Sequence, residues 1–307
     1  MPIDDLPAWL GPWCSDQLGV GMRQVFFRRS QMSLVLGLRL VDGRAVAVKA
    51  RPDENGRADS CVAAQGQLAA RGRPCAAPLT PVVTVQGLSM HAEQWCPGGS
   101  VLRSDTPACA RRVARLFAML MQELTRVKVP PPLPNPHWLR WEHPDAGVWP
   151  AMAFLDCRDQ TLIPEFVTRT AHLAAQRLRR SDLPNVLGHG DFEAQNIRWQ
   201  GEAPLVMHDW DSLSWLPEAA LTGAAAGAFA STEVPTLAPI HSSAAFLQEY
   251  QSTRRRSFTA EEIEVAWAAS LWPAAHNARA QALHGQQPIA GEALRTQAPE
   301  RLALAGA

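Results

Sequence analysis

Two short polar stretches carry the side chains best suited to chemistry in this 307-residue sequence. The first, residues 189–196, reads His-Gly-Asp-Phe-Glu-Ala-Gln-Asn, and the second is the triplet Asp209-Trp210-Asp211. Carboxylate and amide oxygens that converge on one point suit a hard cation such as Mg2+, which is often held by one or two carboxylates together with substrate phosphates. An aspartate outside the metal site could orient or deprotonate an attacking hydroxyl. The two stretches therefore predict a metal site beside a carboxylate base.

The residues around these stretches predict the β-hairpin that must position them. An apolar run ends at Leu187, a second covers residues 197–199, and residues 205–208 read as a returning strand after a turn at residues 200–202. Such a hairpin would bring Asn196 and Asp209 side by side, with Asp191 across the loop from both. The local sequence thus predicts the convergence that a metal site needs.

This arrangement, from Leu187 to Asp211, resembles the aminoglycoside phosphotransferase and choline-kinase-like family of the protein-kinase-like fold. Members of that family carry H-G-D, then Asn after four further residues, then an apolar strand that ends in D-W-D or D-W-E. The resemblance implies that Asp191 is the catalytic base and that Asn196 and Asp209 bind Mg2+. It implies a structural role for His189, which would tie the loop to backbone groups. Asp211 is interpreted as a supporting residue or as the cap of the next turn.

A lysine near the amino-terminal end is the next candidate. Strands are predicted at residues 25–28, 34–41 and 45–50, with Asp42-Gly43 as a two-residue hairpin turn, and Lys49 ends the third strand. Of the 29 basic residues, 27 are arginine and only Lys49 and Lys128 are lysine. A lysine in a chain that otherwise uses arginine suggests a position that needs a compact ammonium group. In the resembled fold, a lysine here binds the α- and β-phosphates of ATP. The alternative interpretation is a solvated strand end.

The remaining nucleotide contacts are assigned from the same resemblance. The turn at residues 29–33 would cover the nucleotide, with Ser30 and Ser33 near the phosphates, although it lacks glycine and also reads as a plain polar turn. Strands are predicted at residues 81–85 and 88–95, followed by a Pro-Gly-Gly turn. The backbone from Glu93 through Trp95 to Cys96 would then form the hinge that binds the adenine edge.

The first helix departs from the family pattern. It is predicted from about residue 55 to residue 71, where Gly72 and Pro74 end it. The family places a glutamate on the inward face of this helix as the partner of the lysine, and counting back from Gly72 puts that position at Cys61. Gln65 on the same face, or Asp59 or Glu54 after a shift of the helix, remain as candidate partners of the lysine.

The rest of the chain reads as mostly helical. Helices are predicted at residues 106–124, 164–180, 217–229, 243–253 and 260–284, with Thr106 as the N-cap of the first of them, and the proline-rich residues 129–136 read as a rigid connector. The predicted fold class is α+β, a protein-kinase-like fold with two lobes. Residues 1–96 would form a small antiparallel β lobe that binds nucleotide. Residues 97–307 would form a larger helical lobe for catalysis and substrate binding.

Composition excludes several classes of function. Basic and acidic residues number 29 each, so charge gives no reason to expect binding to nucleic acid or to an anionic membrane. The amino terminus lacks the pattern of a signal peptide, and no run of 18 apolar residues is present. Six cysteines show no C-x-x-C pair and no zinc-ligand spacing. We expect a cytoplasmic protein whose oligomeric state the sequence leaves open.

The predicted activity is transfer of the γ-phosphoryl group of ATP, with Mg2+, to a hydroxyl of a small molecule. From residue 129 onward the chain has 19 acidic residues against 13 arginines, which favours a cationic acceptor such as an aminoglycoside-like or basic peptide antibiotic. The alternatives are a kinase of an amino alcohol or sugar, and a nucleotide-binding pseudokinase without turnover, suggested by the missing helix glutamate. A metal-assisted hydrolase built on His189, Asp191, His208 and Asp209 is a further rival, although His208 would point away from Asp209 on its strand.

Overall fold

The chain folds into two units that are described one at a time. The computed structural model describes residues 7–30, 32–53, 55–129, 133–143, 145 and 147–307. Unit 1 consists of Met1–Gly99, Val127–Leu133 and Leu205–Asp211, and unit 2 consists of Ser100–Arg126, Pro134–Pro204 and Ser212–Ala307. The functional lobes expected at residues 1–96 and 97–307 stay a prediction. The units differ from these lobes chiefly because the segments 127–133 and 205–211 belong to unit 1.

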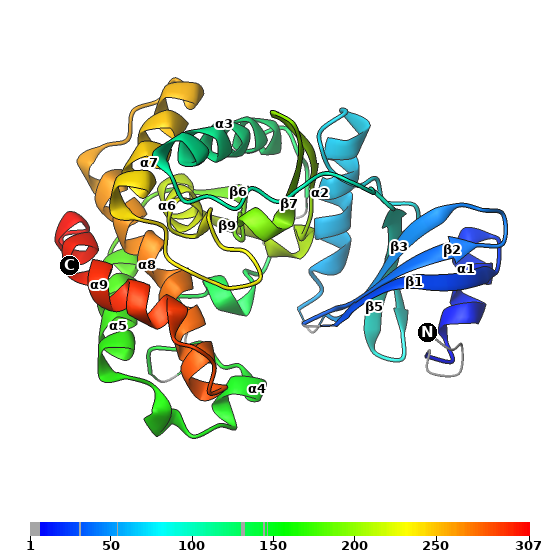
Figure 1. The fold of residues 1–307 in the computed structure, drawn as a ribbon, viewed down its shortest axis with the longest axis horizontal. Helices are drawn as coiled ribbons and strands as arrows, with labels where there is room; N and C mark the ends of the chain where they lie inside the picture. Colours follow the sequence, from blue (N-terminus) through cyan, green and yellow to red (C-terminus); the bar gives the residue numbers. More distant parts are fainter. Residues whose placement is uncertain (1–6, 31, 54, 130–132, 144, 146) are drawn as a thin grey trace. The chain divides into compact units, whose positions relative to one another are not determined.

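Unit 1 is built on an antiparallel sheet with the strand order β1-β2-β3-β5-β4 (Figure 1). Its strands are β1 (Met22–Ser30), β2 (Leu34–Leu40), β3 (Ala45–Pro52), β4 (Val83–Val85) and β5 (Leu88–Gln94), and its helices are α1 (Leu10–Leu18) and α2 (Ala58–Ala70). The expected turn at Asp42-Gly43 joins β2 to β3, and Gly43 has a φ of 89°, which favours glycine. The strands expected from the sequence are therefore confirmed.

The two faces of this sheet differ in chemistry because side chains alternate along each strand. One face packs against α1 and forms an apolar core, which includes Leu10, Trp13, Cys14, Leu36, Leu38, Leu40, Val46, Val48, Met90 and Ala92. The register sets Lys49 of β3 opposite His91 of β5. Arg51 and Glu93 lie two positions further along these strands and share the face of Lys49. The sheet therefore separates an apolar face from a face with four ionisable side chains.

Unit 2 is mostly helical and also contains short strands (Figure 1). Its helices are α3 (Pro107–Leu124), α4 (Ala153–Asp156), α5 (Glu165–Arg179), α6 (Glu218–Ala228), α7 (Ile240–Arg254), α8 (Ala260–Leu283) and α9 (Ile289–Leu304). The strands are β6 (Asn185–His189), which pairs antiparallel with β9 (Leu213–Pro217), and β7 (Ile197–Gln200), which pairs with β8 (Ala203–Met207), a strand that continues into unit 1. Short 3-10 helices cover His137–Leu139, Gln160–Leu162, Ala194–Asn196 and Trp210–Ser212.

Helix α6 approaches α8 closely because two glycines line the contact. A Cβ built on Gly223 would lie 1.9 Å from the carbonyl oxygen of Ala266, and one built on Gly227 would lie 2.4 Å from the carbonyl oxygen of Ser270. Both distances are shorter than any real contact of a Cβ atom, so no larger residue fits there without a shift of backbone. The four-residue spacing puts both glycines on one side of α6 and both carbonyls on one side of α8.

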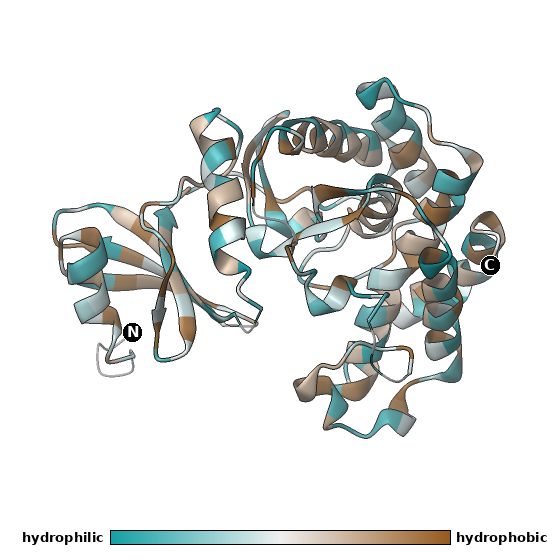
Figure 2. Cartoon of the chain, turned by 180° about the vertical axis from the view of Figure 1, so that it is seen from behind, coloured by the Kyte–Doolittle hydropathy of each residue, from teal (hydrophilic) through white to brown (hydrophobic). Residues whose placement is uncertain are grey.

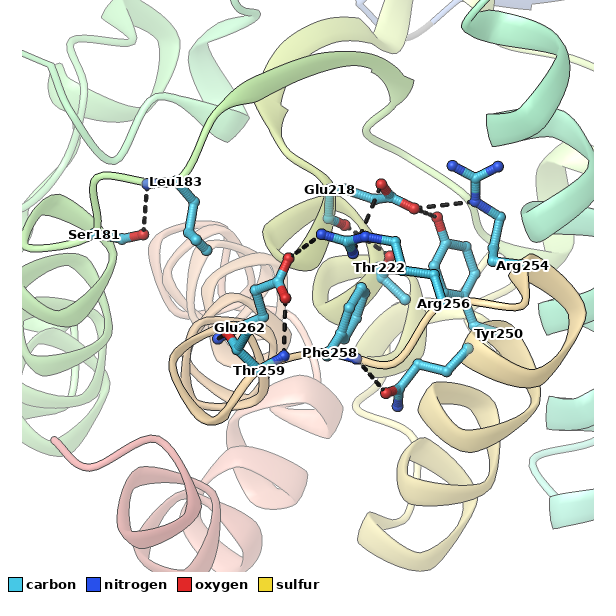
Figure 3. Close-up of polar contacts among 11 residues, drawn as sticks. Ser181, Leu183, Glu218, Thr222, Tyr250, Arg254, Arg256, Phe258, Thr259 and Glu262 are labelled. Atoms are coloured by element: carbon cyan, nitrogen blue, oxygen red, sulfur yellow. Dashed lines mark hydrogen bonds and ion pairs between the residues drawn. The ribbon is translucent and has the colours of Figure 1, made fainter.

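A polar network ties the start of α6 to the segment between α7 and α8 (Figure 3). The Glu218 carboxylate accepts a hydrogen bond from the Tyr250 hydroxyl at 2.6 Å and one from Arg254 Nε at 3.0 Å. Arg256 forms an ion pair with Glu262, which belongs to the capping box that begins α8. These partly buried contacts fix the segment around residues 254–259, and Glu218 is therefore an anchor for the helix that follows β9.

The expected α+β class, the hairpin of β7 and β8, and the N-cap at Thr106 are confirmed. The Thr106 hydroxyl accepts a hydrogen bond from the backbone N–H of Cys109. Strand β9 and helix α9 were not identified from the sequence. Among the described residues no helix is long and apolar enough to cross a membrane, and Figure 2 shows hydrophobic and hydrophilic residues mixed along the helices.

Candidate active site

The loop after β6 is shaped by a glycine. The backbone N–H of Gly190 donates a hydrogen bond to the Ser212 carbonyl at 2.8 Å, directly beside the pairing of β6 with β9. A Cβ at this position would lie 1.9 Å from Leu139 Cδ1 and 3.1 Å from the Ser212 carbonyl oxygen. A larger residue here would have to displace the Leu139 side chain and crowd the Ser212 carbonyl, which favours glycine as the middle residue of the H-G-D motif.

The loop brings Asp191 and Asn196 together within unit 2. Asn196 Nδ2 donates a hydrogen bond to Asp191 Oδ2 at 2.9 Å and another to the Asp191 carbonyl at 3.0 Å. Because the two amide hydrogens are used in this way, Asn196 Oδ1 is the atom that remains for a cation. His189 is 1% exposed, and its Nδ1 accepts a hydrogen bond from the backbone N–H of Asp191 at 3.3 Å. His189 thus holds the loop, as the family resemblance implied.

The triplet at residues 209–211 lies in unit 1 and has an unusual backbone. Asp209 has a φ of 60°, a left-handed conformation that is uncommon for residues other than glycine. Trp210 is 1% exposed and donates its indole N–H to the Met207 carbonyl at 3.1 Å, which anchors the triplet to the end of β8. Strained backbone of this kind clusters at functional sites, so the φ of Asp209 is independent support for a role there.

Asp211 is the partner of an arginine on the polar face of the sheet. Its Oδ1 lies 2.9 Å from Arg51 NH2, and both side chains are largely buried. Burial raises the pKa of Asp211 above its usual range, and the attraction of Arg51 and Lys49 opposes that shift. In the structure, Asp211 therefore supports its surroundings through an ion pair that positions Arg51.

Lys49 forms a buried ion pair with Glu93. Its Nζ lies 3.1 Å from Glu93 Oε1, and the side chains are 10% and 3% exposed. Burial by itself would lower the pKa of Lys49, but the attraction of Glu93, followed by that of Asp211 and Asp209, raises it above its ordinary value. The lysine is therefore held in its charged form on the polar face of the sheet.

Glu93 lies inside β5, within the strand expected at residues 88–95, opposite Ala47 of β3 and beside Pro78 on its other edge. The contact of its backbone with the adenine edge stays a prediction. The side chain of Glu93 was given no role from the sequence, and the structure pairs it with Lys49.

The other hinge and loop residues lie at or next to the ends of strands in this sheet. Trp95 directly follows β5 and packs its ring on Phe26 and Phe27 of β1, with centroid distances of 4.9 and 5.5 Å. Cys96 comes next and is partly buried. Ser30 ends β1 and pairs with Leu34, and Ser33 lies just before β2. The turn between these strands includes Gln31, which lies outside the described residues.

Of the candidate helix partners of Lys49, the two that the structure describes, Gln65 and Asp59, do not take that role. Gln65 donates to Glu93 Oε2 at 2.8 Å and to the Ala76 carbonyl at 2.7 Å. Asp59 is exposed, and Glu54 lies outside the described residues. The sequence signal that could have identified Glu93 is the alternation of side chains along each strand. Alternation alone does not show that Glu93 and Lys49 share a face, because that also requires the register of β3 and β5.

Comparison with family models matches residues 34–220 to a model described as the phosphotransferase enzyme family, APH. The match covers more than half of the chain. This chain belongs to the phosphotransferase enzyme family. A comparison with curated proteins found no match.

Solved structures show the same fold as this phosphotransferase. Amicoumacin kinase hAmiN, solved with AMP-PNP, Ca2+ and Ami, has a TM-score of 0.63 at 11% identity and covers 91% of this chain and 88% of its own. The spectinomycin phosphotransferase APH(9)-Ia, solved with ADP and spectinomycin, has a TM-score of 0.58 at 10% identity, with 100% and 94% covered. A thermostable mutant of APH(4)-Ia, solved with ADP and hygromycin B, has a TM-score of 0.59 at 12% identity, with 97% and 99% covered. At these identities the likeness shows the fold alone.

The oxygen donors of this phosphotransferase fit a hard cation better than zinc. Asp209 in unit 1 carries a carboxylate and Asn196 in unit 2 an amide oxygen, and oxygen groups of these two kinds suit Mg2+. Among the described residues, no group of three or more His, Cys, Asp and Glu side chains is arranged to hold a metal by itself.

Proposed function

We propose that this chain is an ATP- and Mg2+-dependent kinase that transfers the γ-phosphoryl group to a hydroxyl of a cationic small molecule. The observation that carries the proposal is the loop in which Asn196 Nδ2 holds Asp191 Oδ2 at 2.9 Å. This loop lies inside residues 34–220, which match the phosphotransferase family. Phosphoryl transfer depends mainly on positioning and charge neutralisation, and both need side chains that are already fixed.

Asp191 is assigned the role of catalytic base. It orients the acceptor hydroxyl and takes its proton while the acceptor oxygen bonds to the γ-phosphorus. The bond from that phosphorus to the bridging oxygen of the β-phosphate breaks, and ADP leaves. The hydrogen bond from Asn196 keeps Asp191 in one orientation, which is what a base must have when it meets its substrate.

The nucleotide contacts are assigned to the remaining candidates. Lys49 binds the α- and β-phosphates, Ser30 and Ser33 contact phosphate from the turn after β1, and the backbone at Trp95 and Cys96 binds the base. The carboxylate of Asp209 and Oδ1 of Asn196 are the protein ligands for Mg2+. When bound, Mg2+ would neutralise charge on the phosphates. A cytoplasmic location, where ATP and Mg2+ are available, is part of the same proposal, and the six cysteines, all free in the structure, agree with it.

The acceptor is proposed to be cationic because of the charge of the chain beyond residue 129. That part has 19 acidic residues and 13 arginines, an excess that favours an amino sugar or a basic peptide over a neutral acceptor. An antibiotic of this kind would make the enzyme a resistance factor. An amino alcohol or a sugar would make it a metabolic kinase of the same chemistry.

The test is ADP release from Mg·ATP in the presence of a panel of aminoglycosides, basic peptide antibiotics, amino alcohols and sugars. Asp191→Asn should lower turnover with the active acceptor by about 10²–10⁴-fold while nucleotide binding stays. Asp182→Asn, which changes an exposed acid of the same unit, should leave turnover unchanged. Full activity in Asp191→Asn would overturn the assignment, and binding of ATP without ADP release for every acceptor would favour a pseudokinase.

A further inference from the structure

We propose that Glu93 on β5 is the carboxylate that positions Lys49 toward the nucleotide phosphates, in place of a glutamate on the helix. This inference rests on the proposed function, because it assigns Lys49 to the phosphates of ATP. Glu93 is a positioning residue in this scheme, since it acts through Lys49 and has no contact of its own with substrate. Lys49, Glu93 and the residues that contact them all lie within unit 1.

The ion pair spans two neighbouring strands. Lys49 lies on β3 opposite His91, and Glu93 lies two residues along β5 on the same face. The 3.1 Å separation of Lys49 Nζ from Glu93 Oε1 joins two buried side chains, so water does not screen the pair. Burial disfavours the ammonium, and Glu93 is the acid that offsets this cost most, ahead of Asp211 and Asp209.

Glu93 is itself held in a fixed orientation by its second oxygen. Gln65 Nε2 donates to Glu93 Oε2 at 2.8 Å, and the same amide group donates to the Ala76 carbonyl at 2.7 Å. Gln65 is 1% exposed, so the amide is locked between these two acceptors. Glu93 therefore presents Oε1 to the lysine while Oε2 is bound to the helix.

Helix α2 cannot supply the carboxylate itself. The buried residues of this helix are Ala58, Cys61, Val62, Ala64, Gln65 and Leu68, and none is acidic. Burial raises the pKa of Cys61 to about 12, so its thiol stays neutral beside Arg57. The single acid within α2, Asp59, is exposed. Helix α2 therefore supplies the Gln65 amide that orients Glu93, and strand β5 supplies the Glu93 carboxylate that pairs with Lys49.

This placement has a mechanical consequence. Because β3 and β5 are joined by backbone hydrogen bonds over the register from Val46 to Pro52, the distance between Lys49 and Glu93 is set by the sheet. A displacement of α2 would break the hydrogen bond from Gln65 that orients Glu93, but it would leave β3 and β5 paired. The position of the helix should therefore affect the orientation of the Glu93 carboxylate and not the backbone spacing of Lys49 and Glu93.

The presence of only two lysines makes a direct test possible. Lysine labelled with 13C at Cε gives two NMR signals, from the buried Lys49 and the exposed Lys128, and Lys128→Arg assigns them. In Glu93→Gln the pKa of Lys49 should fall by about one unit or more, and calorimetry should show Mg·ATP binding weakened by about tenfold or more. Gln65→Glu added to Glu93→Gln returns a carboxylate to the site and should recover much of both losses.

Two controls separate positioning from a general loss of structure. Asp59→Asn removes the exposed acid of α2 and should change neither the Lys49 titration nor Mg·ATP binding. The Lys128 signal should be the same in the wild type, Glu93→Gln and Asp59→Asn. If Glu93→Gln changed neither the Lys49 titration nor the affinity for Mg·ATP, the inference would be overturned. It would also be overturned if Glu93→Gln lowered the thermal stability of the protein but left the Lys49 titration unchanged. Absence of Mg·ATP binding by the wild-type protein would overturn the proposed function, while the Lys49 titration would still decide whether Glu93 holds the lysine charge.

Discussion

At the scale of single residues, the buried pair of Lys49 and Glu93 links stability to pH. Burial would raise the pKa of Glu93, but Lys49, together with His91 and Gln65, brings it well below its ordinary value. Glu93 therefore adds stability above the ordinary carboxyl pKa of 4.5, and this stability is lost as pH falls through the lowered value. Lys49 has the opposite pH dependence because its pKa is raised in the folded protein. Its contribution to stability is fully present below pH 10.5 and is lost as pH rises through the pKa that Lys49 has in the folded protein.

The first prediction concerns the difference in unfolding free energy between the wild type and Glu93→Gln. This difference should stay constant from pH 4.5 up to the pKa that Lys49 has in Glu93→Gln, because both charges of the pair are then present in the folded and in the unfolded wild type. It should shrink as pH falls below 4.5, since the unfolded wild type gains a proton there that Glu93→Gln cannot bind. Urea denaturation at a series of pH values measures it. A difference that grows on acidification would contradict the sign assigned to Glu93.

Asp209 gives a second prediction at this scale. If its carboxylate is a protein ligand of Mg2+, Asp209→Asn should remove most of the increase in ATP affinity that Mg2+ produces in the wild type. Calorimetric titration of ATP with and without Mg2+ measures both quantities for each protein. Asp182→Asn, at an exposed acid in the other unit, is the control. Equal Mg2+ dependence in the wild type and Asp209→Asn would remove Asp209 from the metal site.

At the scale of elements, the contact of α6 with α8 depends on the absence of side chains. Gly223→Ala should destabilise the protein by about 1–3 kcal/mol, because the new methyl group meets the backbone of Ala266 and not a movable side-chain end. Gly66→Ala in the interior of α2 meets only ordinary contacts, at 3.8 and 3.9 Å from Pro78, and should be neutral or gain about 0.5–1 kcal/mol. Chemical denaturation compares the two. Equal effects would mean that close packing at Gly223 contributes nothing.

The same scale explains what the sequence could predict. The hairpin of β7 and β8 and helices such as α3 follow from local patterns, namely a turn at Gly201 and an N-cap at Thr106. Strand β9 was missed because its five residues precede a helical run, and its partner, β6, lies far away in sequence. The role of Glu93 was missed for a related reason, since it depends on a register between β3 and β5 that no local pattern specifies.

At the scale of the whole molecule, the candidate residues divide between the two units. Lys49, Glu93 and Asp209 belong to unit 1, while Asp191 and Asn196 belong to unit 2. The sequence motifs identified most of these residues because the family pattern is compact around residues 187–211. The acceptor is harder to identify, because the residues after Asp211 carry no comparable motif, and the acidic excess beyond residue 129 is the sequence feature that favours a cationic class.

The most direct test of the central claim is acceptor-dependent ADP release from Mg·ATP, measured for the wild type and Asp191→Asn with the same acceptor. We expect release with a cationic, hydroxyl-bearing acceptor, and a loss of about 10²–10⁴-fold in Asp191→Asn with nucleotide affinity retained. Mass spectrometry of the acceptor should show the added phosphoryl group. ADP release at the wild-type rate in Asp191→Asn would contradict the claim that Asp191 is the base of a kinase.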